Sequence, residues 1–292
     1  MMDLRKWFTA LLLVALLLPT AALAADVYLY IGDIEMRDGD YLANGASVTT
    51  KDKPMSGGYA YLEADGWDLH LTLHNFSYIG CGRYYDIHSK AVINCPEFDS
   101  EFTIHLEGSN YINAKGDESE YHVAIVGDLD FIDGTAEDSL VIEASDMGIS
   151  AIRQLRISGG NVEITAGHMA AEVASGNFRI EQSDKLGTII LRSTNQRTDR
   201  PCYALRAAKG VTKVGTPDKW IIVASESSSG SPLETFDSAD MEKYDYIKIT
   251  RVPDDIHDLP KTGDESDIML WLSLAMTSMA ALSLIARKKR EV

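Results

Sequence analysis

Acidic and basic side chains in the middle of the chain have the types and spacing of an ion or anion site. Asp128 and Asp130 lie two residues apart, which places both on one face of a strand, and Asp133 follows in the next turn. Carboxylate oxygens are the ligands that calcium prefers, so these three aspartates form a candidate calcium site. Arg156 and Arg179 carry planar guanidinium groups that suit carboxylates, and with Asp130 they form a candidate ligand face.

Each of these groups also has a plainer interpretation. The aspartates can form a solvated acidic surface, and Asp130 can pair with the arginines in a salt-bridge ladder that contributes little to stability. A polysaccharide lyase would combine calcium with a basic residue that abstracts a proton. A glycoside hydrolase would need two carboxylates roughly 5–9 Å apart. The chain has 44 acidic residues, so their presence does not decide between binding and catalysis, and no catalytic residue is assigned.

A sequence repeat has to position these residues. Four similar segments begin at Phe102, Leu129, Leu155 and Phe178, with spacings of 27, 26 and 23 residues. Each segment alternates apolar and polar residues, which is the periodicity of a strand. A period in the twenties that is built from three short strands predicts a right-handed parallel β-helix. An Ig-like β-sandwich is the alternative, and it explains the alternation but not the repeat.

The β-helix predicts the direction of each side chain in the repeat. A first inward column consists of the residues that start the segments: Phe102, Leu129, Leu155 and Phe178. A second inward column lies two residues further on: Ile104, Phe131, Ile157 and Ile180. The residues between these two columns should point outward together: Thr103, Asp130, Arg156 and Arg179.

The flanking segments complete the predicted domain organisation. The repeat domain is expected over residues 66–250, and residues 251–258 form a short charged spacer. Residues 25–65 are either a cap or a small separate strand module. A cap would serve a physical need, because an open β-helix end exposes strand edges that invite aggregation.

Parts of the repeat, over residues 102–110, 155–165 and 244–249, are similar to segments of a known group of proteins. They resemble the β-helical "carbohydrate-binding domain-containing" surface proteins of clostridia-like bacteria, and the resemblance covers roughly residues 66–250. It implies a pectin-lyase-like fold and the binding of an acidic plant polysaccharide or a host surface glycan. It supplies no catalytic residue.

The N-terminus has the three parts of a secretory signal peptide. Arg5 and Lys6 form a basic region, and an apolar run follows over residues 7–18. The segment Ala22-Leu23-Ala24 supplies the small residues of a cleavage site. Residues 1–24 are therefore expected to be removed on export.

The C-terminus carries the pentapeptide Leu259-Pro260-Lys261-Thr262-Gly263, an apolar run over residues 268–286 and a basic tail over residues 287–292. An apolar run of this length can cross a bilayer core of ~30 Å as a helix, and the basic tail would stay in the cytoplasm. In this order the three parts resemble the LPxTG cell-wall sorting signal of Gram-positive bacteria. The resemblance implies that the transpeptidase sortase cuts between Thr262 and Gly263 and joins the threonine to peptidoglycan. A retained single-pass anchor is the alternative.

Cysteine and histidine usage gives little sign of metal or redox chemistry. The chain has three cysteines, and Cys81 and Cys95 are near enough to close a small loop. A disulfide there would stabilise by roughly 3 kcal/mol, but the sequence leaves this pairing open. CxxC and HExxH motifs are absent from the sequence, so a zinc site is not expected. His70 and His74 alternate with leucines as on a strand, where they would lie ~13 Å apart, too far to share one metal ion.

Composition narrows the expected partners. A formal net charge of −17 and a pI near 4.7 argue against nucleic acid, which attracts basic surfaces. The expected function is that of an exported, sortase-anchored cell-wall protein that binds carbohydrate or mediates adhesion. A wall-bound polysaccharide lyase or glycoside hydrolase is the alternative. No cofactor other than the candidate calcium ion is expected.

Overall fold

The computed structural model describes residues 27–96, 101–116, 121–127, 129–181, 183–194, 201–215 and 220–251. Most of these residues lie in β-strands, and residues Ser238–Lys243 form the short 3₁₀ helix η2. Within these ranges no helix is long and apolar enough to cross a membrane. The predicted signal peptide, the LPxTG pentapeptide, the apolar run 268–286 and the basic tail lie outside the described residues. So does the predicted spacer, except for its first residue, Arg251, which ends β24 (Tyr246–Arg251).

The strands belong to three sheets, which we call A, B and C. Sheet A consists of β2 (Ile34–Arg37), β1 (Tyr28–Ile31), β8 (Ser89–Asn94), β11 (Tyr121–Gly127), β14 (Met147–Ala151), β17 (Met169–Val173) and β20 (Tyr203–Ala207), with β7 (Arg83–Asp86) also paired to β8. Sheet B consists of β21 (Val211–Val214), β18 (Asn177–Glu181), β15 (Gln154–Ile157), β12 (Leu129–Asp133), β9 (Phe102–Glu107), β5 (Asp68–His74), β4 (Tyr59–Asp65) and β3 (Tyr41–Ala43). Sheet C consists of β23 (Glu234–Thr235), β22 (Trp220–Ser225), β24 (Tyr246–Arg251), β19 (Leu186–Ser193), β16 (Gly160–Ala166), β13 (Ser139–Ala144), β10 (Ser109–Ala114) and β6 (Ser77–Gly80).

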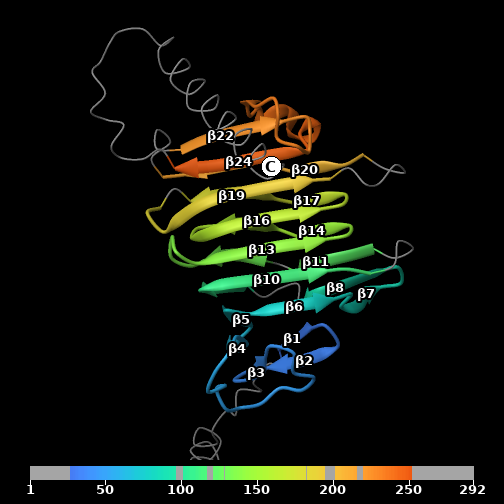
Figure 1. Ribbon diagram of the computed structural model, residues 1–292, viewed down its shortest axis with the longest axis vertical. Coiled ribbons are helices and arrows are strands. Elements are labelled where there is room, and N and C mark those ends of the chain that lie inside the picture. The colour runs from blue at the N-terminus through green and yellow to red at the C-terminus, as the bar shows by residue number, and fades with distance from the viewer. Residues whose placement is uncertain are drawn as a thin grey trace, which may run out of the picture. The chain divides into compact units, whose positions relative to one another are not determined.

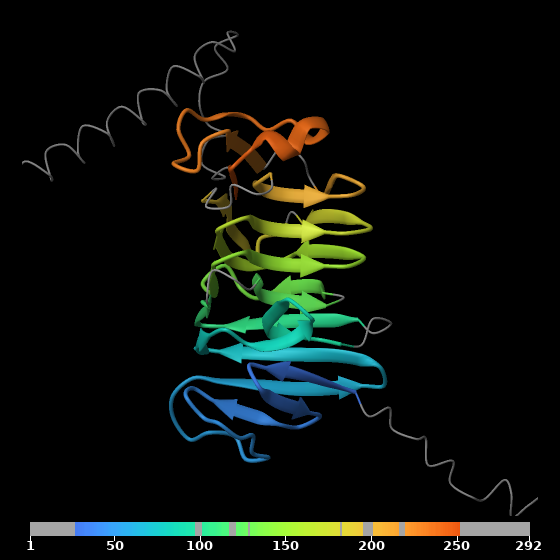
Figure 2. The ribbon, with the colours of Figure 1, turned by 90° about the vertical axis from the view of Figure 1, so that its right-hand side faces the viewer.

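The chain visits the three sheets in a fixed order. The groups β8–β9–β10, β11–β12–β13, β14–β15–β16 and β17–β18–β19 each give one strand to sheet A, one to sheet B and one to sheet C. Every strand then pairs in parallel with its equivalent in the next group, so that successive groups lie one above another (Figures 1 and 2). The repeat of three short strands is confirmed. The Ig-like alternative is wrong, because that fold consists of two antiparallel sheets.

The first predicted inward column is confirmed. Its four members, Phe102, Leu129, Leu155 and Phe178, are fully buried in one apolar core. Phe102 aligns with Leu129, and Leu155 aligns with Phe178. Burial of each such side chain contributes roughly 1.5–3 kcal/mol to the stability of the fold, so this column stabilises the stacked strands of sheet B.

A β-bulge in β12 changes which residues of this strand occupy the other two predicted columns. The register of β12 against β9 shifts between Leu129 and Phe131, so that Phe131 aligns with Thr103 on one side and with Arg156 on the other. Phe131 therefore points outward, and the fully buried Ile132 takes the inward place predicted for it. Asp130 is the extra residue of the bulge and is only 4% exposed. The prediction that Asp130 stands in the outward arginine column is wrong.

Side-chain amides fix the connections between sheets B and C. Asn110 accepts a hydrogen bond from the backbone N–H of Phe76 at 2.8 Å and donates one to the carbonyl of Ser139 at 3.2 Å. Asn161 accepts from the backbone N–H of Thr188 at 3.0 Å. Each amide thus links one group of strands to the next, which holds the register of the stack at these turns.

The N-terminal segment belongs to the same sheets as the repeat. Strands β1 and β2 pair antiparallel along the edge of sheet A, and β3, β4 and β5 form an antiparallel run at the end of sheet B. Leu29, Met36 and Leu62 are fully buried in the common core. The expected boundary between residues 65 and 66 falls within the β4–β5 hairpin, so this segment covers one end of the stack.

Antiparallel strands also cover the opposite end. Strand β24 pairs with β19 and with β22, and so extends sheet C beyond the parallel strands. The helix η2 lies against β20 of sheet A. Tyr244, which follows η2, is 1% exposed and accepts a hydrogen bond from Ala204 through its carbonyl at 2.7 Å. These contacts protect strand edges that would otherwise invite pairing with other chains.

Candidate ligand-binding face

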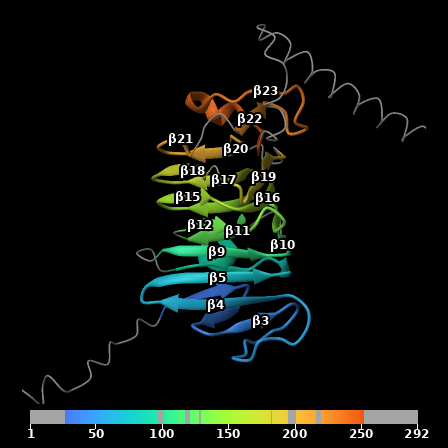
Figure 3. The same ribbon diagram turned by 90° about the vertical axis from the view of Figure 1, so that its left-hand side faces the viewer.

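The outward face of sheet B carries the two predicted arginines. Figure 3 shows its strands from β3 to β21 one above another. Across β9, β12, β15, β18 and β21, one outward column contains Thr103, Phe131, Arg156, Arg179 and Thr212. The arginines lie on adjacent paired strands, ~4.8 Å apart along the column. The structure therefore brings Arg156 and Arg179 together as the sequence predicts.

Arg156 is held in place from two sides. Its guanidinium lies over the ring of Phe131, 4.3 Å from the ring centroid, and its Nη2 forms an ion pair with Glu181. Burial lowers the pKa of Arg156, and the positive charge of Arg179 lowers it further. The guanidinium nevertheless stays charged at any physiological pH, because arginine does not deprotonate in proteins.

Arg179 is held less firmly. It is half-buried, and within the described residues it makes no ion pair. The Nε atoms of Arg156 and Arg179 are both buried and have no hydrogen-bond partner. Two like charges on neighbouring strands repel each other, and an anion that bridges them would relieve that repulsion.

Two amide side chains lie beside the arginines on the same face. Gln154 and Asn177 are directly paired across β15 and β18, each two residues before an arginine. Gln154 donates a hydrogen bond from Nε2 to Asp130 Oδ1 at 2.7 Å, and Asn177 donates from Nδ2 to Thr212 Oγ1 at 2.8 Å. The carbonyl oxygens of both amides are acceptors.

Histidines and carboxylates of β5, β9 and β12 occupy several columns of the same face. His105 aligns with Asp133, and their Nδ1 and Oδ1 atoms are 2.5 Å apart. This hydrogen bond raises the pKa of His105, although partial burial acts in the opposite direction. His70 stacks on His105 with 5.7 Å between ring centroids, and His74 lies 3.0 Å from Glu107.

The predicted calcium ligands do not come together. Asp128 lies outside the described residues. Asp130 is buried against Gln154, whereas Asp133 lies on the outward face against His105. In the part of the chain that the structure describes, no group of three His, Cys, Asp or Glu residues has the arrangement of a metal site. The calcium site stays a prediction that two of its three members do not support.

The disulfide between Cys81 and Cys95, which the sequence leaves open, is not formed. Cys81 carries a thiol that takes no part in a disulfide, and Cys95 is buried. The stabilisation expected from closing the loop between them is therefore absent from the fold.

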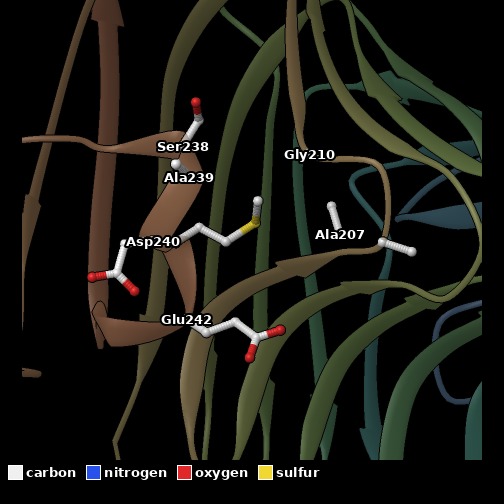
Figure 4. A pocket seen from close by; sticks show the side chains of 8 residues that line it. Ala207, Gly210, Ser238, Ala239, Asp240 and Glu242 are labelled. Atoms are coloured by element: carbon white, nitrogen blue, oxygen red, sulfur yellow. The ribbon is translucent and has the colours of Figure 1, made fainter.

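An open pocket of about 360 Å³ lies between η2 and the end of β20. Figure 4 shows Asp240 and Glu242 on its η2 side and Ala207 and Gly210 on the other. Glu242 already lies 3.5 Å from Arg206. The pocket contains none of the residues that the sequence singled out, and its acidic lining does not suit an acidic ligand.

Sequence reasoning missed four residues that lie beside the arginines. Gln154, Asn177 and Glu181 were recoverable, because each lies two residues from a predicted arginine and so shares its side of the strand. Phe131 was not, because the bulge that turns it outward leaves no clear mark in the sequence. No family model, no curated protein and no solved structure matches the chain. Its function therefore has to be inferred from its own residues.

Proposed function

We propose that this chain is a sortase-anchored surface protein of a Gram-positive bacterium that binds acidic polysaccharide. The two ends of the sequence support export and anchoring, through the signal-peptide pattern and the LPxTG pentapeptide. The outward face of sheet B supports the binding of a polyanion. The partners are then sortase and peptidoglycan on the bacterial side, and an acidic plant polysaccharide or host surface glycan on the other.

The finer architecture is part of the same proposal. We take the repeated visits to sheets A, B and C to form a single right-handed parallel β-helix. The supporting observations are the parallel pairings and the fixed order of the three strands in each group. Parallel strands joined by crossover connections are almost always right-handed, which favours that hand. Such a scaffold places equivalent residues of successive groups in straight outward columns.

The observation that carries the proposal is the arginine pair. Arg156 and Arg179 are adjacent, like-charged and half-buried on a protein whose formal net charge is −17. Folding forces two cations together here although acids are abundant elsewhere in the chain. Guanidinium groups bind carboxylates through two parallel hydrogen bonds, which makes a uronate-bearing polymer a suitable ligand.

The test is the affinity of the mature domain for polygalacturonate. The double variant Arg156→Ala plus Arg179→Ala should bind at least tenfold more weakly, because each charge-assisted hydrogen bond contributes roughly 1.5–3 kcal/mol. The control variant Arg192→Ala plus Arg206→Ala removes the same charge from sheets C and A. An equal loss in both variants would mean that only overall charge matters.

The same incubation separates binding from catalysis. A binding protein retains the polymer without shortening it. New reducing ends or unsaturated products would instead identify a wall-bound hydrolase or lyase. Adding and removing calcium in parallel tests whether the ion contributes to either activity.

A further inference from the structure

The four side chains Gln154, Arg156, Asn177 and Arg179 form a two-by-two array on the outward face of sheet B. Gln154 pairs with Asn177, and Arg156 pairs with Arg179, in the same register of β15 and β18. Neighbours along a strand are two residues apart, ~6.6 Å, and neighbours across the strands are ~4.8 Å apart. The array thus places two amides beside two guanidinium groups.

The amide of Gln154 has a fixed orientation. Asp130 is a carboxylate, which only accepts hydrogen bonds when it is ionised, so the Gln154 nitrogen must face it. The Gln154 carbonyl oxygen therefore points away from Asp130. Asp130 is 4% exposed and sits at the bulge, where it is out of reach of a polymer on the surface. Asp130 contacts the array by its hydrogen bond with Gln154.

Asn177 offers a second acceptor on the next strand. Its nitrogen donates to the hydroxyl of Thr212 on β21, which leaves the carbonyl oxygen for a donor from outside the chain. Gln154 and Asn177 are both half-buried, so their side chains reach the surface. The arginine side of the array offers only hydrogen-bond donors, whereas the amide side also offers acceptors.

We infer that this array recognises a uronate residue as a hydroxyl-bearing sugar acid, with the arginines on its carboxylate and the amide oxygens of Gln154 and Asn177 on its hydroxyl groups. Asp130 is the positioning residue that orients Gln154. This inference rests on the proposed function and adds selectivity to it. A fully sulfated polymer satisfies the arginines but has few free hydroxyls to donate to the amides.

The experiment compares two probes, polygalacturonate and a highly sulfated dextran, on the same full mature domain. Gln154→Met keeps the length of the side chain and removes its amide. It should weaken polygalacturonate binding about tenfold, as the loss of one buried polar contact does, and leave sulfated dextran within about twofold. Arg156→Ala plus Arg179→Ala should weaken both probes.

Asp130→Asn tests the positioning role. Asparagine has nearly the same shape but can donate as well as accept, so the orientation of Gln154 is no longer specified. The ratio of the two affinities should fall about threefold, with an unchanged melting temperature. Ser150→Ala, on sheet A, is the control that should leave the ratio alone.

The outcomes separate the two claims. If the wild type binds neither probe, the proposed function itself is wrong. If it binds polygalacturonate through the arginines but Gln154→Met weakens both probes equally, or neither, the selectivity array is wrong. A drop confined to polygalacturonate supports it. Circular dichroism of each variant shows whether a loss of binding comes from a loss of fold.

Discussion

The outward faces of sheets B and C are built on the same stack of strands but arrange their charges in opposite ways. On sheet C, Glu143 accepts hydrogen bonds from Tyr111 and from Asn113, both at 2.8 Å, so its charge is bound within the chain. On sheet B, two arginines stand side by side, and only Arg156 has an ion-pair partner among the described residues. Glu143 of sheet C is thus held by two side chains of its own sheet, whereas Arg179 of sheet B makes no ion pair among the described residues.

This difference shows how neighbouring residues in a column of a repeated scaffold affect stability. Each strand adds one residue to every column, and successive residues of a column lie ~4.8 Å apart. Whether a column stabilises or destabilises the fold therefore depends on which residues are neighbours in it. Complementary neighbours, such as Asn113 and Glu143, stabilise the fold. Like-charged neighbours destabilise it slightly and provide a site for a counter-charge.

The largest expected effect concerns whether either face is displayed at all. Thr262→Ala should abolish covalent attachment to peptidoglycan, because the threonine supplies the carboxyl group that sortase would transfer. Labelled wall fragments from a sortase-positive host measure this, with Thr250→Ala as a control threonine. Equal wall linkage in Thr262→Ala and wild type would refute the sorting interpretation.

The next prediction tests the core that both faces share. Leu155→Ala removes a fully buried side chain from the first inward column, and it should lower the free energy of unfolding by ~2–5 kcal/mol. Denaturant titration measures the change. Val141→Ala, at a half-buried outward position of sheet C, should cost much less. A small cost at Leu155 would contradict its place in the core.

Strand β12 shows where prediction from the sequence succeeds and where it fails. The period-two alternation identifies Leu129 and Leu155 as core residues, because apolar residues recur there with the repeat. It fails two residues later, because one extra residue in a strand moves every following side chain to the opposite face. The spacings of 27, 26 and 23 residues show that the units differ in length, but they do not locate the bulge.

The candidate site was predicted to a similar extent. Arg156 and Arg179 were placed correctly because both follow regular segments that begin with a core residue. The role of Asp130 was not predictable, because its partner Gln154 is a long-range contact that only the bulge creates. Local pattern therefore finds the columns, and irregularities that depend on tertiary packing decide which residues fill them.

An intermediate effect on stability is expected from a substitution on the outward face of sheet C. Glu143→Ala removes the carboxylate partner of Asn113, whose amide keeps its hydrogen bond to the Tyr111 hydroxyl at 2.6 Å, so the change should cost only about 1 kcal/mol of stability. Polygalacturonate affinity should not change. Glu163→Ala, on the next strand, is the control and should stay within about 0.5 kcal/mol of wild type. Weaker polymer binding by Glu143→Ala would break the division between the two faces.

The smallest effect is a pH dependence of stability on sheet B. The hydrogen bond to Asp133 raises the pKa of His105 above its ordinary value near 6.5. Since the folded protein then binds a proton more tightly than the unfolded chain, this pair stabilises most fully below about pH 6.5. Its contribution is lost as the pH rises through the raised pKa of the folded state.

Solvent keeps that contribution small, because the side chains of His105 and Asp133 are 40% and 38% exposed. Less than about 1 kcal/mol is expected. Unfolding titrations of wild type and His105→Gln at pH 5.5 and pH 8.5 measure it. The two proteins should differ more at pH 5.5 than at pH 8.5, while His88→Gln, an exposed histidine near β8, should track wild type at both. A difference that grows at pH 8.5 would show that His105 is stabilised in its neutral form, and that Asp133 does not act on it as an ionised partner.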